Sequence, residues 1–240
     1  MPSTKAFDLI RASSPTISVG IISANLMNIE ADLIQLEKTD LKMIHYDVMD
    51  GCFVPYMTVG PPLVKGIKTD LLKDVHLMIQ DPLDKVEDYV NAGADMITVH
   101  IEACRDIKDV LVNLGKLENK NDPNRGIIRG IAINPDIPVE SLEPLINNVD
   151  MIVVLAVNPK IKGLPFDESF VERFDSIRKL VANSEKDILL CIDGGIKLEN
   201  VGDFAKLGAD ILVSGSAIFK SNSPAENVDY MLRSIKSQIL

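Results

Sequence analysis

Short apolar runs alternate with stretches of helical periodicity along the whole of this 240-residue chain. Runs rich in β-branched residues predict eight strands, at residues 16–22, 43–47, 75–79, 96–100, 129–133, 151–157, 188–193 and 211–214. Between them, apolar residues recur at the i, i+4, i+7 spacing that places side chains on one face of a helix. Three such stripes are Ile29, Leu33 and Leu36; Phe170, Phe174, Ile177 and Val181; and Val228, Leu232, Ile235 and Ile239.

This alternation predicts βαβ units, whose strands are parallel and are joined by right-handed crossovers. Eight units in 240 residues match the size of a (β/α)8 TIM barrel. A doubly wound open sheet is the alternative, but no GxGxxG motif follows the first strand. We therefore expect a single-domain α/β TIM barrel over residues 16–240, after an N-terminal extension over residues 1–15. Asp81-Pro82 predicts the N-cap and first turn of the helix after the third strand.

Charge and composition restrict the possible partners. The net charge of −10 argues against a nucleic acid or an anionic membrane as partner, because phosphate-rich surfaces attract basic proteins. The sequence contains no apolar run that could span a bilayer, and its first 15 residues lack the hydrophobic stretch of a signal peptide. We expect a cytoplasmic protein in which any bound phosphate is held locally, by backbone amides and a few side chains.

Polar residues interrupt the apolar runs at the end of each predicted strand. In a TIM barrel, the carboxyl ends of the strands carry the chemistry. The residues at these ends are His45, Asp47, His76, His100, Asn134, Asn158, Asp193 and the segment Ser214-Gly215-Ser216. Random surface polarity would not gather at one end of every strand, so the pattern indicates a site at the barrel mouth.

Side chains alternate across a strand, so His45 and Asp47 point the same way, as do His76 and Met78. Buried ionised carboxylates are costly unless they are paired or bind a metal. Two histidines and two aspartates would supply four ligands for a divalent cation: His45, Asp47, His76 and Asp193. This N2O2 set suits zinc, iron, manganese or cobalt.

Each polar residue also has a structural explanation. A lone strand histidine is more often a hydrogen-bonded core residue, and this is the interpretation we favour for His100. Asp50-Gly51 could be a simple turn. Asp193-Gly194-Gly195 could be a strand-to-helix turn with an N-cap. The joint placement of these residues at strand ends favours a functional site.

Seven motifs carry a resemblance to a known family. They are HYDVMDGCFVP (45–55), DVHLMI (74–79), GADMITVHIE (93–102), INP (133–135), VNP (157–159), DGGIK (193–197) and GADILVSGSAIF (208–219). In these motifs and their order the sequence resembles the ribulose-phosphate 3-epimerase family, from about residue 17 to the C-terminus. The first two motifs are highly specific, whereas DGG and GSAIF recur in other phosphate-binding barrels.

The resemblance implies an isomerase that interconverts D-ribulose 5-phosphate and D-xylulose 5-phosphate in the pentose phosphate pathway. It also implies a homo-oligomer and one divalent metal per chain, zinc being the first expectation and iron, manganese or cobalt the alternatives. The implied metal ligands are His45, Asp47, His76 and Asp193, with Asp47 and Asp193 as the catalytic acid/bases. The implied substrate contacts are Met49, Met78, Gly163, Gly194, Gly195, Gly215 and Ser216, and Leu155 replaces the family's third methionine.

The sequence departs from the family's motifs in three places, which bear on substrate identity, phosphate affinity and loop closure. Gly20 replaces the family's serine on the first strand, and Tyr56 replaces the asparagine after FVP. The glycine-rich loop after the sixth strand reads NPKIKGL, which introduces Lys160 and Lys162. Either lysine could contact the phosphate, or both could be solvated.

Three alternative functions remain open: epimerisation of another ketose phosphate such as a hexulose 6-phosphate, a metal-assisted isomerisation or decarboxylation of a phosphosugar, and binding without turnover. The intact Asp47/Asp193 pair argues against binding alone, because a binding protein needs no base on each face of the substrate.

Overall fold

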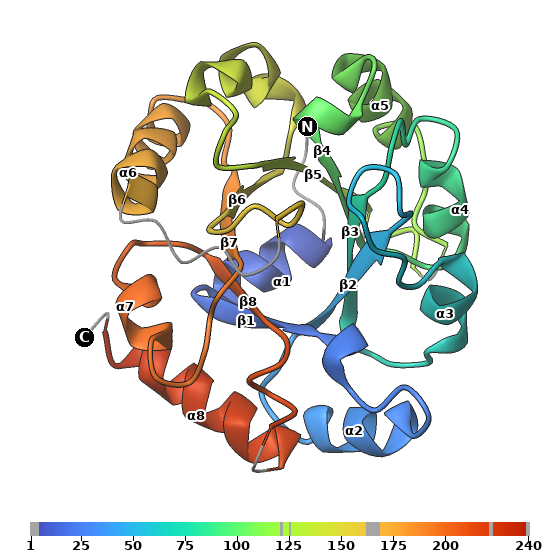
Figure 1. The fold of residues 1–240 in the computed structure, drawn as a ribbon, viewed down its shortest axis with the longest axis vertical. Coiled ribbons are helices and arrows are strands. Elements are labelled where there is room, and N and C mark those ends of the chain that lie inside the picture. The colour runs from blue at the N-terminus through green and yellow to red at the C-terminus, as the bar shows by residue number, and fades with distance from the viewer. Residues whose placement is uncertain (1–4, 121, 125, 162–168, 221–222, 239–240) are drawn as a thin grey trace.

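The computed structural model describes residues 5–120, 122–124, 126–161, 169–220 and 223–238, in which eight parallel strands close into a barrel in sequential order (Figure 1). The strands are β1 (Thr16–Gly20), β2 (Met43–Met49), β3 (Leu72–Met78), β4 (Met96–His100), β5 (Ile128–Ile133), β6 (Met151–Leu155), β7 (Leu189–Asp193) and β8 (Ile211–Ser214). Because β1 pairs with β8 as well as with β2, the sheet has no free edge. The predicted TIM barrel is confirmed and the open sheet is excluded.

Helices surround the barrel (Figure 1). The α-helices after the strands are α2 (Ile29–Leu36), α3 (Pro61–Gly66), α4 (Val86–Asn91), α5 (Ile107–Leu114), α6 (Ser169–Ala182), α7 (Val201–Ala205) and α8 (Pro224–Lys236). Short 3-10 helices, η1 (Ile21–Ser23) and η2 (Ile101–Ala103), directly follow β1 and β4. Between β5 and β6 the connection is a longer 3-10 helix, η3 (Val139–Asn148), with Pro144 inside it. Proline lacks an amide hydrogen and clashes with the preceding α-helical turn, which accounts for the absence of a regular α-helix there.

The predicted helical stripes pack against the outer face of the barrel. Leu33 and Leu36, Phe170, Phe174 and Ile177, and Val228, Leu232 and Ile235 are buried in one apolar cluster with outward-facing strand residues. Ile239 lies outside the described residues. Strand limits differ from the prediction by a few residues, because β1 passes into η1 at Ile21 and β3 begins at Leu72.

The prediction that Asp81 caps the helix after β3 is wrong. That helix, α4, begins at Val86 with Lys85 at its N-cap, and Asp81 has a positive φ of 48°. The carbonyl of Pro82 accepts hydrogen bonds from the amides of Lys85 and Val86, so a separate turn precedes the helix. The Asp81 side chain instead forms an ion pair with Arg105, at 2.7 Å.

A second apolar cluster fills the barrel interior and closes it at the amino ends of the strands. It contains Met43, Leu72, Met96, Ile128, Met151, Leu189 and Ile211 at or near the strand starts, together with Ala6, Phe7 and Ile10 of the N-terminal helix α1 (Lys5–Ser13). Figure 1, which views the barrel along its axis, shows α1 lying across the centre. Apolar side chains therefore fill the amino end of the barrel interior, opposite the end at which Asp47 and Asp193 lie.

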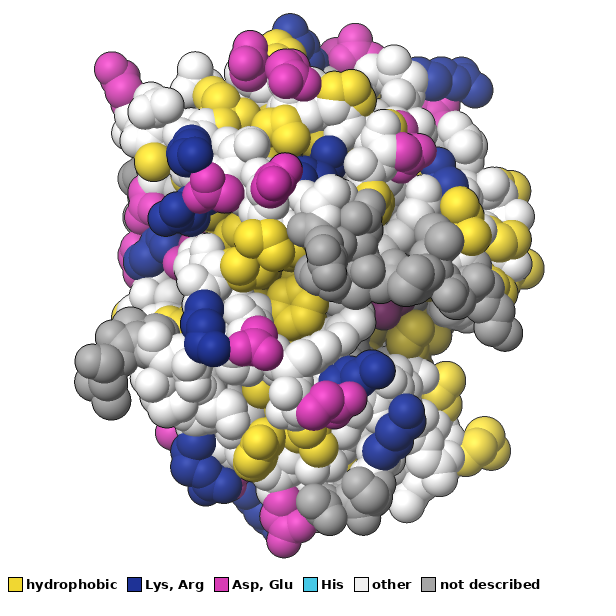
Figure 2. Space-filling view, turned by 60° about the vertical axis from the view of Figure 1, so that its left-hand side comes forward, with side chains coloured by type: hydrophobic (Ala, Val, Ile, Leu, Met, Phe, Trp, Pro, Cys, Tyr) yellow, Lys and Arg dark blue, Asp and Glu magenta, His cyan; other side chains and the backbone are white. Residues whose placement is uncertain are grey.

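The outer surface is mixed in charge. Figure 2 shows one face of the molecule, on which acidic and basic side chains are interspersed. On α6, for example, Asp175 forms ion pairs with Arg178 and Lys179, both at 2.7 Å. Within the described part of the chain, every helix is too short or too polar to cross a bilayer.

Candidate functional site

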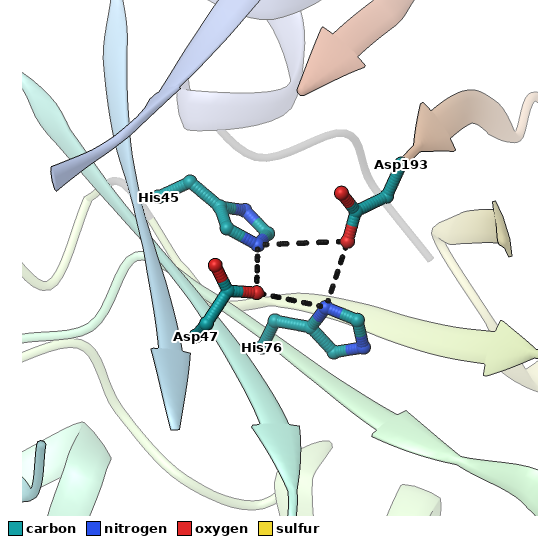
Figure 3. Close-up of side chains that lie close together, drawn as sticks. All are labelled: His45, Asp47, His76 and Asp193. Atoms are coloured by element: carbon teal, nitrogen blue, oxygen red, sulfur yellow. Dashed lines mark ion pairs between the residues drawn. The ribbon is translucent and has the colours of Figure 1, made fainter. Parts of the chain in front are cut away.

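Four side chains from three strands converge at the carboxyl end of the barrel (Figure 3). His45 and Asp47 come from β2, His76 from β3 and Asp193 from β7. Residues 45 and 47 share the inner face of β2, and the parallel register sets Asp47 beside His76. One nitrogen or oxygen atom from each side chain lies within 4.8 Å of those of the other three. The structure thus brings together the four residues that the sequence suggested as ligands.

The spacing of these four atoms suits a single metal ion. His45 Nε2 lies 3.3 Å from Asp47 Oδ1 and 3.9 Å from Asp193 Oδ2. His76 Nδ1 lies 3.2 Å from Asp193 Oδ2 and 3.9 Å from Asp47 Oδ1. Metal–ligand bonds of about 2.1 Å in a tetrahedral site separate neighbouring ligand atoms by about 3.4 Å. The four distances between these histidine and aspartate atoms, 3.2–3.9 Å, bracket that separation.

The chemistry of the donors also fits a cation. His45 Nε2 and His76 Nδ1 are buried and form no hydrogen bond among the described residues. Leaving such an atom unpaired costs about 1–3 kcal/mol, so a cation that accepts both lone pairs would relieve two penalties. The two carboxylates would offset its charge.

Asp74, a carboxylate outside the set of four ligand candidates, orients His45. Asp74 Oδ2 lies 2.7 Å from His45 Nδ1 and accepts a hydrogen bond of 3.0 Å from the hydroxyl of Ser18. A proton on Nδ1 leaves the lone pair of Nε2 directed at the centre of the site. Burial by itself lowers the pKa of His45, but Asp74 and Asp47 outweigh burial and raise that pKa well above its usual value. Burial raises the pKa of Asp47, yet His45 lowers it overall. The surroundings of the site therefore favour positive charge at its centre.

His76 is held by a second histidine. His76 Nε2 lies 2.9 Å from His100 Nε2, and His100 Nδ1 lies 3.3 Å from Glu102 Oε1. The interpretation of His100 as a hydrogen-bonded core residue is confirmed, and burial lowers its pKa to about 4. Burial raises the pKa of Glu102, but the contact with His100 lowers it overall. Sequence reasoning missed Glu102, although it stands two residues after a strand-end histidine.

Apolar side chains lie beside the four polar ones. Met49 and Met78 are register neighbours on β2 and β3, and Met78 is buried against Phe53. Leu155 pairs with Asp193 in the β6–β7 register and is buried in the inner cluster. The structure thus places the two predicted methionines and the substituted leucine on strands that carry ligand candidates or lie next to them.

Glycine backbone borders the site next to Asp193. Gly194 and Gly195 have φ values of +111° and +72°, which favour glycine. A Cβ on Gly194 would also lie 2.9 Å from a methyl group of Val157. Helix α7 begins only at Val201, so Asp193 does not cap the following helix. The Asp193 carboxylate instead faces His45 and His76.

The ends of β1 and β8 approach each other closely. A Cβ on Gly20 would lie 3.0 Å from Gly215 Cα, and a Cβ on Gly215 would lie 2.8 Å from Ser23 Oγ. The hydroxyl of Ser214 donates a hydrogen bond to the carbonyl of Ile196, which ties the turn after β8 to the one after β7. Glycine at position 20, where the resemblance leads one to expect serine, therefore fits a narrow space against backbone.

Comparison with known proteins identifies the family. The model of the ribulose-phosphate 3 epimerase family matches residues 16–219. The chain belongs to this family. It is 34% identical over 223 residues to the chloroplastic ribulose-5-phosphate-3-epimerase of Arabidopsis thaliana, covering 92% of this chain and 77% of that protein. It is 33% identical over 219 residues to the ribulose-phosphate 3-epimerase of Escherichia coli strain K12, covering 90% and 93%.

Solved structures support the fold. The 3-hexulose-6-phosphate synthase of Salmonella typhimurium superposes with a TM-score of 0.68 at 16% identity, covering 93% of this chain and 99% of that one. The 3-keto-L-gulonate-6-phosphate decarboxylase of Vibrio cholerae gives a TM-score of 0.66 at 14% identity, covering 93% and 98%. At such identities the likeness concerns the barrel alone.

Among the residues in which this member departs from the family pattern, Lys160 has a defined environment. Its Nζ lies 4.2 Å from the ring centroid of Phe53, and that ring lies 4.8 Å from the ring of His100. The side chain of Asn158 accepts a 3.0 Å hydrogen bond from the amide of Lys160. The Lys160 ammonium thus contacts the loop after β2. Lys162 and Gly163 lie outside the described residues.

Two other residues at strand ends accept hydrogen bonds from neighbouring segments. Asp50 accepts hydrogen bonds from the amides of Cys52, Phe53 and Gln80, which confirms the turn at Asp50-Gly51 and joins the loops after β2 and β3. Asn134 is fully buried, and its carbonyl accepts a 2.8 Å hydrogen bond from Arg173.

Proposed function

We propose that this protein is a metal-dependent 3-epimerase that interconverts D-ribulose 5-phosphate and D-xylulose 5-phosphate. One observation carries the proposal: in a member of this family, two aspartates and two histidines from three strands meet within 4.8 Å at the barrel mouth. The names of the curated relatives support the choice of substrate.

His45 Nε2, His76 Nδ1 and one oxygen each from Asp47 and Asp193 would hold the cation. Zinc is our first choice, because two imidazoles and two carboxylates form a common four-coordinate zinc set, and iron, manganese or cobalt would also fit. When bound, the cation supplies Lewis-acid stabilisation of the negative charge that develops on the substrate oxygens, which contributes several kcal/mol.

Inversion at C3 requires a proton to leave one face of the carbon and another to arrive at the opposite face. Asp47 reaches the site from β2 and Asp193 from β7, and the two side chains approach from different directions (Figure 3). Their side chains are 23% and 14% exposed, whereas the two histidines are almost fully buried. The carboxylates can therefore contact a substrate in the mouth. In this proposal one acts as base while the other, protonated, acts as acid, and the roles alternate with direction through an enediolate.

The remaining contacts follow from the same arrangement. Met49 and Met78 would pack against the carbon skeleton of the substrate. Backbone amides in the two turns after β7 and β8 would bind the phosphate, because consecutive amides in such turns form anion-binding concavities. The residues of these turns are Gly194, Gly195, Gly215 and Ser216. Gly163 lies outside the described residues, and its contact with the substrate stays a prediction from the resemblance. A homo-oligomer remains a prediction by analogy with the family.

A proton NMR assay in D2O tests the proposal. Purified protein loaded with zinc, manganese, cobalt or iron is incubated with D-ribulose 5-phosphate and, separately, with a hexulose 6-phosphate. We expect D-xylulose 5-phosphate with one deuterium at C3, and slower turnover of the hexulose 6-phosphate. Turnover of the hexulose 6-phosphate alone would reassign the substrate. Tight binding of both sugars without exchange at C3 would support the non-catalytic alternative.

A further inference from the structure

All three histidines of the chain belong to one buried network. The rings of His76 and His100 are nearly parallel, with an interplanar angle of 9° and centroids 4.9 Å apart. Their Nε2 atoms are only 2.9 Å apart. Rings stacked face to face could not bring two atoms this close, because their planes would lie about 3.5 Å apart. The two imidazoles therefore meet edge to edge, in the geometry of an N–H···N hydrogen bond.

The proton positions on His76 and His100 follow from two groups: the metal-facing Nδ1 of His76 at one end and the Glu102 carboxylate at the other. If His76 Nδ1 is a metal ligand, it carries no proton, and the proton of the neutral ring is on Nε2. That Nε2–H must donate to His100 Nε2, which is then unprotonated. The proton of His100 is consequently on Nδ1, where it donates to the carboxylate of Glu102, 3.3 Å away. Only one arrangement of neutral rings satisfies every contact.

We propose that His100 and Glu102 are positioning residues for the metal centre: they fix His76 as the tautomer whose Nδ1 lone pair points at the cation. This rests on the metal centre of the proposed function. Neither residue is one of the four ligand candidates. Their role is to hold the orientation and proton position of a ligand, as carboxylates beside metal-binding histidines do elsewhere.

The two histidine ligands are thus held in different ways. His45 contacts its carboxylate, Asp74, directly at 2.7 Å, and both side chains are 1% exposed. His76 is connected to Glu102 only through His100, and the Glu102 side chain is 14% exposed. The Phe53 ring lies 4.8 Å from the His100 ring and 4.2 Å from the Lys160 ammonium, so it contacts both. We call the contacts from His76 through His100 to Glu102 the relay. Its outer end therefore lies at the rim of the barrel mouth, near Phe53 and Lys160.

Imidazole NMR tests the proton order without any mutation. The zinc-loaded protein, labelled with 15N in histidine, has three rings to assign. We expect protons on Nδ1 of His45, Nε2 of His76 and Nδ1 of His100. Zinc bound with His100 protonated on Nε2 would overturn the relay alone. Zinc bound with His76 protonated on Nδ1 would also remove His76 from the ligand set, and with it the metal centre as proposed. If zinc shifts none of the rings, the metal centre and the relay are both wrong.

Variants test whether the relay affects metal binding. His100→Leu removes the acceptor for His76, whereas the amide oxygen of His100→Gln can replace it, and Glu102→Gln removes the terminal charge. We expect His100→Leu and Glu102→Gln to weaken zinc binding by about 10–100-fold in competition with a chelator. His100→Gln should restore most of the affinity, and Glu199→Gln, a change at an exposed glutamate, should leave it unchanged.

A purely structural role predicts a different result for the same variants. Thermal stability would fall, while the zinc affinity of the folded fraction stayed at the wild-type value. Wild-type affinity in both His100→Leu and Glu102→Gln would overturn the proposal. Because affinity is measured without substrate, this result would leave the epimerase proposal standing.

Discussion

Asp74 Oδ2 lies 2.7 Å from His45 Nδ1 in the barrel interior, where it also accepts the hydroxyl proton of Ser18. The aspartate is the third residue of β3 and the histidine the third of β2, and the parallel register pairs them directly. A buried carboxylate at this distance fixes which nitrogen of His45 is protonated. The pair therefore links the core of the barrel to its functional end.

We predict that Asp74→Asn weakens metal binding by about 10–100-fold, because the amide cannot hold the His45 proton with equal strength. Chelator competition with zinc measures the change. Ser18→Ala is the matched control, since it removes one hydrogen bond to the same carboxylate and should cost only about 1 kcal/mol of stability. Equal zinc affinity in wild type and Asp74→Asn would show that His45 is oriented by packing alone.

We predict that Asp47→Asn and Asp193→Asn each abolish epimerisation while leaving the fold intact. Each carboxylate serves one face of the carbon in the proposed mechanism, so one variant should still exchange deuterium into one epimer only. NMR in D2O, started separately from each epimer, measures this exchange, and circular dichroism checks the fold. Near-wild-type turnover by either variant would rule out the two-base mechanism.

We predict that Lys160→Ala raises the KM for the phosphorylated ketose and reduces its dependence on salt. If the ammonium leaves Phe53 to contact phosphate, its loss should cost roughly 1.5–3 kcal/mol, or about 10–150-fold. The same substitution at Lys162 tests the second lysine, and Lys197→Ala, at an exposed lysine paired with Glu199, is the control. Unchanged kinetics in Lys160→Ala, Lys162→Ala and the double variant would leave the phosphate to the two turns after β7 and β8.

Asp150, directly before β6, makes the acid stability of the barrel depend on its ion pairs at the amino ends of the strands. Asp150 receives hydrogen bonds from Arg129 Nε and Nη2 at 2.8 and 3.0 Å, and from Lys186 Nζ at 2.7 Å. Burial alone raises the pKa of Asp150, but these cations lower it overall. Its folded pKa is thus below its unfolded value of about 3.9, so the stabilisation is present above pH 4 and is lost as pH falls through the folded pKa.

We therefore expect Asp150→Asn to cost about 2–4 kcal/mol at neutral pH, because it leaves two cations without their carboxylate. Below pH 4 the difference from wild type should shrink. Urea unfolding at several pH values measures this trend. Asp203→Asn, which removes an exposed ion pair with Lys206, should change little at any pH. A difference between Asp150→Asn and wild type that is independent of pH would show that the ion pairs are not its origin.

The sequence by itself determined the barrel and the four converging side chains. Apolar strand runs and amphipathic helices are local patterns, and their alternation leaves few topologies. His45 and Asp47 share a face because side chains alternate along any strand. Parallel strands also place their carboxyl ends together, so His76 and Asp193 could be added from their positions at strand ends.

Only the tertiary structure decided how these side chains are supported. Asp74 reaches His45, and His100 joins His76 to Glu102, because barrel closure and strand register bring separate strands into contact. The close approach of Gly20 to Gly215 likewise depends on the pairing of the first strand with the last. Local patterns record which face a residue occupies, but distances between strands depend on the packing of the whole barrel, to which every strand contributes.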